Sequence, residues 1–379
     1  MKLDSIQISQ FRNLTNVELL PSPSLNLVYG DNGSGKSSIL EAIHFLGYGR
    51  SFRTSKPKHI IQTTKPDFSV FAKCSITCPD RNERKLKRLG ISRNIKDELI
   101  CSVDGERSSR MADLVSILPV QIFTPQSIDL MIGSPSARRK FLDWGLFHVE
   151  HSYGDLSRSY RRLVKQRNAL LKKLLRSSKF FAVQSADTKS QIDYWDTQLS
   201  ILGEQINDRR LSYVKQLNKE FSEVIRHFLP EFSFQISYYS GWDIALSLKS
   251  HLESKFGQDL KLGSTSSGVH KADLRIKTDG GVAAFEVLSR GQLRMLVAAL
   301  QLAQTKILNL QGDNSGVFLL DDIGAELDDK HRQVFISSLM KTDTQVFITA
   351  IEKGQFSLSA ETYNKKMFHV KHGHVIEEQ

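Results

Sequence analysis

The sequence predicts an α/β fold interrupted by a mostly helical insertion, and three observations predict it. Short apolar runs typical of buried strands lie near both ends of the chain, at residues 25–29, 317–320 and 345–348. A Gly-rich segment follows the first run, and an acidic pair follows the second. Between them, from about residue 155 to residue 229, apolar residues recur at helical spacing. One site is therefore expected to form from the two ends of the chain.

The Gly-rich segment from Gly30 to Ser37 fits the pattern G-x-x-x-x-G-K-[S/T] at every fixed position. Glycines let backbone N–H groups turn toward phosphate oxygens where a Cβ would clash. Lys36 is expected to reach the β- and γ-phosphates of ATP, and the Ser37 hydroxyl is expected to bind Mg²⁺. Apolar residues at helical spacing follow, so a helix N-terminus should point at the phosphates. The residues predicted here to bind nucleotide are Gly30, Asp31, Asn32, Gly33, Ser34, Gly35, Lys36, Ser37 and Ser38.

The acidic pair Asp321-Asp322 directly follows the apolar run 317–320. In P-loop proteins a carboxylate at such a strand end holds Mg²⁺ through its water shell, and Asp321 fits that role. Asp322 then lies where a general base would polarise the attacking water. Lys36, Asp321 and Asp322 are the predicted catalytic residues, and Ser37 and Asp321 are the predicted metal ligands. The alternative is a solvated turn after a strand.

The segment Leu288-Ser289-Arg290-Gly291-Gln292 precedes an apolar helical stripe, about thirty residues before the acidic pair. Ser289 is expected to cap a helix, and Gly291 to let an anion approach the backbone. Taken alone, such a segment is most often just a helix start. Its spacing resembles that of the ABC-type ATPases, whose signature L-S-G-G-Q caps the nucleotide bound by a second subunit. The residues predicted to bind nucleotide in this way are Ser289, Arg290, Gly291 and Gln292.

Together these segments resemble the RecF family of bacterial DNA repair proteins, relatives of the SMC and Rad50 ATPase heads, over essentially the whole chain. Further stretches that carry the resemblance are Gln10–Leu14, Gly133–Pro135, Arg138–Asp143 and His270–Leu274. The resemblance implies an ABC/SMC-like P-loop ATPase head, with Arg12 and Asn13 also at the nucleotide. The expected ATPase lobe comprises residues 1–125 and 265–379, and the helical lobe comprises residues 126–264.

The resemblance also implies a function: an ATP-dependent DNA-binding clamp that closes as a homodimer and hydrolyses ATP weakly, with stimulation by DNA. Such a clamp would act in recombinational repair, replication and the SOS response. It would bind gapped DNA or single-to-double-strand junctions and help load a RecA-type recombinase with RecR and RecO partners.

Two departures from the ABC pattern bear on the rate of hydrolysis. Asp322 stands where Glu is usual, and Thr349 or a neighbour replaces a histidine that commonly contacts the γ-phosphate. The shorter carboxylate reaches a water less well, so slow turnover is expected. Two alternatives stay open: the nucleotide-binding subunit of a membrane transporter, and a nucleotide switch that binds ATP and never hydrolyses it.

Composition favours a polyanionic partner, because 52 Lys and Arg against 41 Asp and Glu give a net charge of +11. No stretch approaches about eighteen uninterrupted apolar residues, and no apolar signal segment opens the chain. A cytoplasmic protein without a membrane span is therefore expected. The odd cysteine count, Cys74, Cys78 and Cys101, suits a reducing compartment. Core packing is expected of Cys74 and Cys78 rather than metal binding.

Two long helices are predicted within the insertion, from Asp155 to Arg176 and from about Ser190 to Leu229, where Pro230 ends the second. The polar stretch 176–189 between them is a predicted loop, so the pair should form an antiparallel hairpin. Basic residues lie off the apolar stripe of the first helix: Arg158, Arg161, Arg162, Lys165, Arg167, Lys172, Lys173 and Arg176. The residues of this face predicted to bind DNA phosphates are Arg158, Arg161, Arg162 and Lys165. The open alternative is a solvated helix face.

Four other stretches carry weaker predictions. Residues 68–101 read as β-rich, with 81–88 as a charged hairpin turn. Residues 230–261 are expected to carry strands that return the chain to the ATPase lobe. The stretch 263–268 reads as a flexible connector or a nucleotide-adjacent loop. The basic run 138–140 is either structural or couples the two lobes, and the sequence does not decide between these roles.

Overall fold

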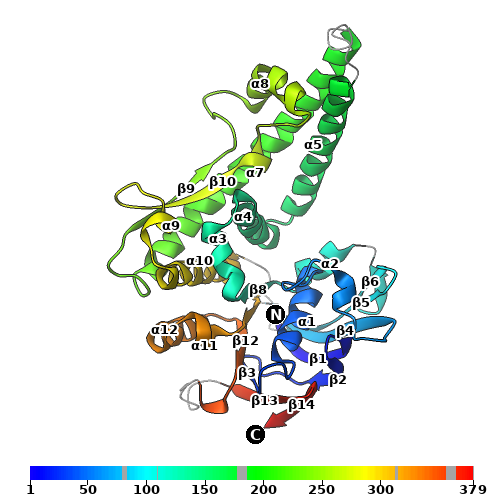
Figure 1. Cartoon of the computed structure of the whole chain (residues 1–379), viewed down its shortest axis with the longest axis vertical. Helices are drawn as coiled ribbons and strands as arrows, with labels where there is room; N and C mark the ends of the chain where they lie inside the picture. Colours follow the sequence, from blue (N-terminus) through cyan, green and yellow to red (C-terminus); the bar gives the residue numbers. More distant parts are fainter. Residues whose placement is uncertain (79–82, 109, 177–185, 312–314, 356–363, 379) are drawn as a thin grey trace. The chain divides into compact units, whose positions relative to one another are not determined.

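The computed structural model describes the chain except residues 79–82, 109, 177–185, 312–314, 356–363 and 379 (Figure 1). The chain divides into two compact units, each described below by itself. Unit 1 comprises Met1–Ile128, Glu223–Pro230 and Leu288–Gln379, and unit 2 comprises Asp129–Ser222 and Glu231–Val287. Unit 1 thus contains both ends of the chain, with unit 2 inserted between them.

The first sheet of unit 1 has six strands in the order β14-β13-β3-β12-β11-β8, and every pairing except β13 with β14 is parallel. Its strands are β3 (Leu25–Tyr29), β8 (Val120–Phe123), β11 (Val317–Leu320), β12 (Gln345–Ala350), β13 (Lys365–Lys371) and β14 (His374–Glu378). Every residue of β3, β11 and β12 is buried, as expected of strands that are covered on both faces. The three predicted buried strands are confirmed. Because β3 pairs with β12 and β13, a strand from one end of the chain lies between two strands from the other.

The second sheet of unit 1 has the order β2-β1-β4-β5-β6-β7, and all its pairings are antiparallel. Its strands are β1 (Lys2–Phe11), β2 (Leu14–Leu19), β4 (Asp67–Cys78), β5 (Glu83–Asn94), β6 (Leu99–Val103) and β7 (Glu106–Ser108). The prediction of a β-rich region is confirmed. Residues 83–88, expected in a turn, belong to β5, and residues 81 and 82 of that turn lie outside the described residues. Cys74 and Cys101 are buried free thiols, and the Cys78 side chain is outside the description.

Helix α1 (Lys36–Tyr48) packs against strands of both sheets: β1, β4 and β5 of the antiparallel sheet, and β8 and β12 of the parallel one. Its apolar side chains enter one continuous core, in which Phe45 makes edge-on ring contacts with Phe11 and Phe68. Burying each such side chain stabilises the fold by about 1.5–3 kcal/mol. The other helices of unit 1 are α2 (Met111–Ile117), α10 (Arg290–Gln311), α11 (Ile323–Glu326), α12 (Asp329–Met340) and the short 3₁₀ turns η1 (Pro57–His59), η2 (Pro125–Ile128) and η4 (Lys353–Gln355).

Unit 2 is built on a pair of long helices. Its elements are α3 (Asp129–Ile132), α4 (Pro135–Val149), α5 (Tyr153–Arg176), α7 (Ala186–Ile225, from Glu223 part of unit 1), β9 (Phe234–Tyr239), α8 (Leu248–Leu262), η3 (Val269–Lys271), β10 (Asp273–Thr278) and α9 (Ala284–Val287). Arg167 of α5 bonds Asp196 of α7, and Tyr153 at the start of α5 bonds Arg210 further along α7. The two helices therefore run antiparallel, and the predicted hairpin is confirmed (Figure 1).

Two expectations for the second half of unit 2 differ from the structure. The expectation of strands in residues 230–261 is correct for Phe234–Tyr239, which form β9. It is wrong for Leu248–Leu262, which form α8, a helix that begins where the Ser247 hydroxyl accepts a hydrogen bond from the Ser250 N–H. Residues 265–287, assigned to the ATPase lobe, belong to unit 2, because β10 pairs with β9. The loop after α8, read from the sequence as a flexible connector or a nucleotide-adjacent loop, is held in place by hydrogen bonds. Thr265 bonds Asn168, and Ser266 bonds Asp259.

Arg167 was wrongly placed on the solvent-facing basic surface of α5. It is completely buried, and its guanidinium lies 2.5 Å from Oδ1 of Asp196 and 2.6 Å from Oδ2 of Asp259. A buried charge requires such partners, so this arginine joins α5, α7 and α8. Arg138 and Arg139 are structural as well: the first binds Asp273 at 2.7 Å, and the second donates to the Ala272 carbonyl at 2.7 Å.

Candidate functional site

The Gly-rich loop connects β3 to α1, and its backbone is one that glycine alone adopts easily. Gly30 has φ of 145°, and a Cβ there would lie 2.2 Å from the carbonyl oxygen of Val370. Gly35 has φ of 123°, and a Cβ there would lie 2.9 Å from the Leu14 side chain. Because α1 begins at Lys36, its first backbone N–H groups face the loop, which is the arrangement that binds phosphates at a helix N-terminus.

The Lys36 side chain is buried over this loop. Its ammonium donates to the carbonyl oxygens of Gly30 at 2.7 Å and Asp31 at 2.9 Å. Burial lowers the pKa of Lys36, while the negative charges of Asp322, Asp321 and Asp31 act in the opposite direction. Three carboxylates thus favour a cation at this point.

The acidic end of β11 reaches the same place from the other half of the sequence. The Ser37 hydroxyl donates to Oδ1 of Asp321 at 2.9 Å, and the Thr349 hydroxyl lies 3.0 Å from the same oxygen. Asp321 is only 6% exposed. The structure therefore brings Lys36, Ser37 and Asp321 together, as the order of the motifs predicted.

Asp322 adopts the left-handed backbone conformation, with φ of 53°. Its N–H donates to the Thr349 hydroxyl at 2.9 Å, so Thr349 contacts both members of the acidic pair. Asp322 also lines the cavity beside the loop. Thr349, noted in the sequence only as a replacement for histidine, thus holds the backbone of Asp322 and the carboxylate of Asp321.

A cavity of about 760 Å³ lies over the loop, within the usual size range of small-molecule sites. The predicted residues that line it are Arg12, Asn13, Asn32, Gly33, Gly35, Lys36, Ser37, Ser38 and Asp322. The other predicted residues, Gly30, Asp31, Ser34 and Asp321, are not among its described lining residues. The lining residues that the sequence analysis missed are Arg53, His59, Ile61, Gln62 and Thr63. They lie on the irregular chain between α1 and β4, which carries no motif that could have identified them.

Arg12 and Asn13 bind different neighbours of the cavity. The Arg12 guanidinium binds Glu41 of α1 at 2.7 and 3.0 Å and donates to the His59 carbonyl at 2.7 Å. Asn13 donates to the Gly33 carbonyl at 3.2 Å and accepts from Ser38. Both residues line the cavity, and both side chains are already hydrogen-bonded within the protein.

Ser37 and Asp321 fit a Mg²⁺ ion by chemistry. They offer a hydroxyl and a carboxylate oxygen, and Mg²⁺ prefers hard oxygen donors, with one or two carboxylates completed by phosphate oxygens and water. Burial raises the pKa of Asp321 even though the hydrogen bonds from Ser37 and Thr349 lower it, so a cation here would stabilise the carboxylate. These two residues would hold the ion.

The segment Leu288–Gln292 lies at the start of α10 in unit 1. The Ser289 N–H donates to Oε1 of Gln292 at 2.9 Å, and the Gln292 N–H donates to the Ser289 hydroxyl at 3.3 Å. This reciprocal pair is a capping box, so Ser289 does cap the helix as predicted. Ser289, Arg290 and Gly291 are exposed, and all four residues from Ser289 to Gln292 lie outside the described lining of the cavity. The structure does not bring them to the chain's own nucleotide-binding loop.

The four basic residues predicted to bind DNA are all exposed on α5 of unit 2. Arg158, Arg161, Arg162 and Lys165 are spaced so that they share one helix face. Arg158 pairs with Asp155 at 3.2 Å, and Arg161 donates to the Ser157 carbonyl at 3.2 Å. Among the residues that the structure describes, no helix is both long enough and apolar enough to cross a membrane.

Comparison with known proteins gives a consistent result. Residues 2–375 match the family model described as RecF/RecN/SMC N terminal domain. The chain is 48% identical to the DNA replication and repair protein RecF of Pseudoalteromonas atlantica, over 100% of both chains. It is 40% identical to the protein of that name from Shewanella sediminis, over 99% of both.

Among solved structures, one titled "Structure of the recombination mediator protein RecF-ATPrS in RecFOR pathway" matches with a TM-score of 0.85 and 26% identity. The match covers 100% of this chain and 98% of that one. An Smc head bound to the C-winged helix domain of ScpA matches with a TM-score of 0.60 and 14% identity, over 100% and 98% of the two chains, and shows the fold alone.

Proposed function

The chain belongs to the RecF family of DNA replication and repair proteins, and on that premise we propose that it is an ATP-dependent DNA-binding clamp. The contact between Ser37 and Asp321 carries the proposal, because it unites the phosphate loop with the acidic strand end in one site. The capping segment 289–292 lies outside that site and is largely exposed, so it is available to contact the nucleotide of a second copy of the chain.

ATP would occupy the cavity over the loop. Two matching solved structures are titled as ATP and ATPrS complexes of the recombination mediator protein RecF, which supports this assignment. Lys36 and the first N–H groups of α1 would hold the phosphates, and Ser37 and Asp321 would hold Mg²⁺. When bound, Mg²⁺ neutralises charge on the phosphate oxygens.

Asp322 would orient the attacking water and accept its proton. Its left-handed backbone is fixed by Thr349, and its side chain is one methylene shorter than Glu. Turnover would therefore be slow, and hydrolysis would time the release of the clamp rather than drive movement. Family membership argues against the transporter-subunit alternative, and a turnover assay separates a slow ATPase from a switch that never hydrolyses ATP.

Closure would require a second copy of the chain. The segment 289–292 of one copy would cap the nucleotide held by Lys36 of the other, so that ATP joins the two copies. Unit 2 would contact DNA through phosphates, with Arg158, Arg161, Arg162 and Lys165 on α5 as the proposed residues. RecR and RecO partners, loading of a RecA-type recombinase and action at gapped DNA follow from the family resemblance.

The test measures dimer formation and DNA binding on the same sample, by light scattering and fluorescence anisotropy, with and without ATP. ATP should produce the dimer and raise DNA affinity for the wild type, whereas Lys36→Met should remain monomeric. Lys341→Met, an exposed lysine outside the site, is the matched control and should behave as wild type. DNA binding that ignores nucleotide, with no dimer formed, would refute the clamp.

Mixing two defective variants tests the shared site directly. Lys36→Met and Ser289→Arg should each be inactive alone. A mixed dimer holds one intact site, built from Lys36 of one copy and Ser289 of the other, so mixing should restore turnover. Failure of the mixture, with both variants folded, would place segment 289–292 outside the nucleotide site.

A further inference from the structure

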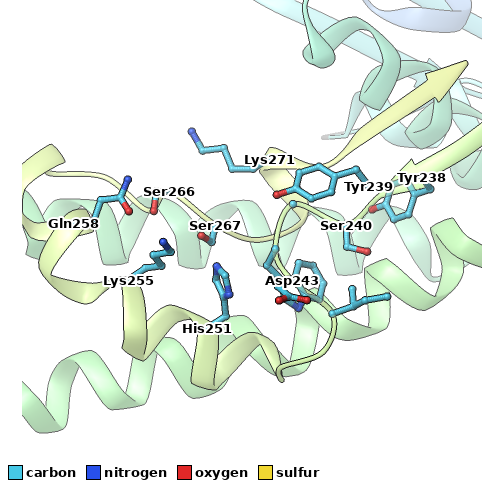
Figure 2. Close-up of a pocket in the computed structure, with 13 residues that line it drawn as sticks. Tyr238, Tyr239, Ser240, Asp243, His251, Lys255, Gln258, Ser266, Ser267 and Lys271 are labelled. Atoms are coloured by element: carbon cyan, nitrogen blue, oxygen red, sulfur yellow. The ribbon is translucent and has the colours of Figure 1, made fainter. Parts of the chain in front are cut away.

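Unit 2 contains a second pocket, of about 670 Å³, within the size range of ligand-binding sites (Figure 2). Its walls are the end of β9 with the turn that follows as far as Ile244, one face of α8, and residues 266–271. In the part of the chain that the structure describes, this pocket shares no lining residue with the cavity over the phosphate loop.

The pocket presents groups that suit a phosphate. Lys255 and His251 project from α8 toward the loop that carries Ser267, and Lys271 extends from the end of that loop (Figure 2). Among the described residues, Asp243 is the one carboxylate in the lining, and no carboxylate lies within ion-pair distance of either lysine. Two ammonium groups and a hydroxyl around an open volume attract an anion.

An aromatic ring lies at the edge of the same pocket. Tyr239, at the end of β9, is 41% exposed, and the guanidinium of Arg275 lies 4.7 Å from its ring centroid. The preceding Tyr238 is held by a hydrogen bond from Arg210, which anchors the strand. An exposed aromatic ring beside cations is the arrangement on which proteins stack unpaired bases.

The loop that forms the pocket floor is held rigidly. The N–H and hydroxyl of Ser266 both donate to Asp259, and the N–H of Gly268 donates to the Gly241 carbonyl at 3.1 Å. A Cβ at Gly241 would lie 2.1 Å from the Gly268 oxygen, so the two segments pack backbone against backbone. Both ring nitrogens of His270 are hydrogen-bonded as well. A site ordered in advance loses less entropy when it binds.

We propose that this pocket binds one nucleotide of single-stranded DNA, with the phosphate against Lys255, Lys271 and Ser267 and the base stacked on Tyr239. The proposal rests on the proposed DNA-binding function and names the unpaired strand of a gap as the part that unit 2 contacts. A blunt duplex keeps its base faces stacked and offers Tyr239 no partner.

The experiment compares a single strand, a gapped duplex and a blunt duplex by fluorescence anisotropy, with the full chain and ATP. Tyr239→Ala should weaken single-strand binding about thirtyfold, the middle of the range for one stacked base, and leave the blunt duplex unaffected. Tyr239→Phe keeps the ring and should bind as wild type. Lys271→Ala and Lys255→Ala should each reduce the salt dependence of single-strand binding by about 0.7 in log–log slope.

Matched controls lie in the same unit. Tyr194→Ala removes an exposed tyrosine of α7, and Lys261→Ala removes an exposed lysine of α8, both outside the pocket. Both should match wild type. A strand carrying 5-iododeoxyuridine should also crosslink to the peptide that contains Tyr239.

Each outcome is decisive. If wild type binds DNA and the pocket variants bind like the controls, the pocket proposal fails while the clamp proposal stands. If wild type binds no DNA with or without ATP, the clamp proposal fails with it. If a mononucleotide displaces the strand from the pocket at equal concentration of nucleotide units, the pocket is a free-nucleotide site and the proposal is overturned.

Discussion

Replacing Arg167 with Met should destabilise unit 2 by about 4 kcal/mol at pH 7. The methionine fills the space of the arginine stem but leaves Asp196 and Asp259 buried without their cation. Asp259 keeps two hydrogen bonds from Ser266. Asp196, whose pKa is already raised by burial, is therefore the carboxylate that the missing cation destabilises most.

Protonation of Asp196 limits the cost. A carboxyl group has an ordinary pKa near 3.9, so keeping it neutral at pH 7 means protonating it about 3 pH units above that pKa. Each pH unit costs about 1.36 kcal/mol, which gives the figure of about 4 kcal/mol. In the variant the folded state binds the extra proton, so its stability deficit shrinks as pH falls, to about 1.5 kcal/mol at pH 5. The pH dependence therefore separates a lost charge pair from lost packing.

Urea unfolding followed by hydrogen-exchange mass spectrometry measures this, because peptides of α5, α7 and α8 report on unit 2 and those of α1 and α10 report on unit 1. Lys172→Met, an exposed residue of the same helix, is the control and should be nearly neutral. Adding Asp196→Leu to Arg167→Met should recover much of the loss. A deficit below about 1 kcal/mol, or one equal at pH 5 and pH 7, would refute this reasoning.

Three further predictions concern the nucleotide site and acid stability. Asp322→Glu should raise ATP turnover by about ten- to a hundredfold in a phosphate-release assay, because the added methylene extends the carboxylate toward the water. Asp329→Glu on α12 is the control. Unchanged turnover in Asp322→Glu would show that Asp322 does not position the water. Thr349→Val should lower ATP turnover and reduce the free energy of unfolding by about 1–3 kcal/mol, because it leaves the Asp322 N–H unpaired. Thr349→Ser keeps the hydroxyl and should be close to wild type. Equal effects of the two substitutions would contradict this role of the hydroxyl. Burial lowers the pKa of His148 to about 3 and that of His270 to about 4, so both side chains bind protons when the protein unfolds. The melting temperature should therefore fall as pH drops below about 6.5. A melting temperature that stays constant down to pH 5 would disprove this prediction.

The candidate nucleotide site was largely predictable because its parts leave local patterns. Strand β11 is a continuous apolar run and β3 is apolar except for Asn26, and their carboxyl ends carry the acidic pair and the glycine loop. Parallel strands of one sheet end at the same edge, so motifs 284 residues apart could be expected to meet, as Ser37 and Asp321 do.

The structure of unit 2 was less predictable, because its contacts depend on partners far along the chain. Arg167 lies on the buried stripe of α5, between Tyr160 and Leu171, but its charge favours a solvent-facing position. Its buried partners Asp196 and Asp259, at separations of 29 and 92 residues, leave no sign in the local sequence pattern. Helix α8, by contrast, was missed although local signals mark it: Leu248, Leu252, Phe256 and Leu260 recur at helical spacing, between a capping Ser247 and a left-handed Gly263. Arg53 and Gln62 line the cavity from the irregular segment between α1 and β4, and no periodic sequence pattern predicts the course of such a segment.

The position of β3 between β12 and β13 has a consequence for how the protein is made. On the ribosome, β3 emerges more than 300 residues before the last of its neighbours, which is on the order of 15–60 s at about 5–20 residues per second. Throughout that time both edges of a mostly apolar strand lack their partners. Nascent chains, and fragments truncated before β12, are therefore the forms of this protein most dependent on chaperones and most prone to aggregate.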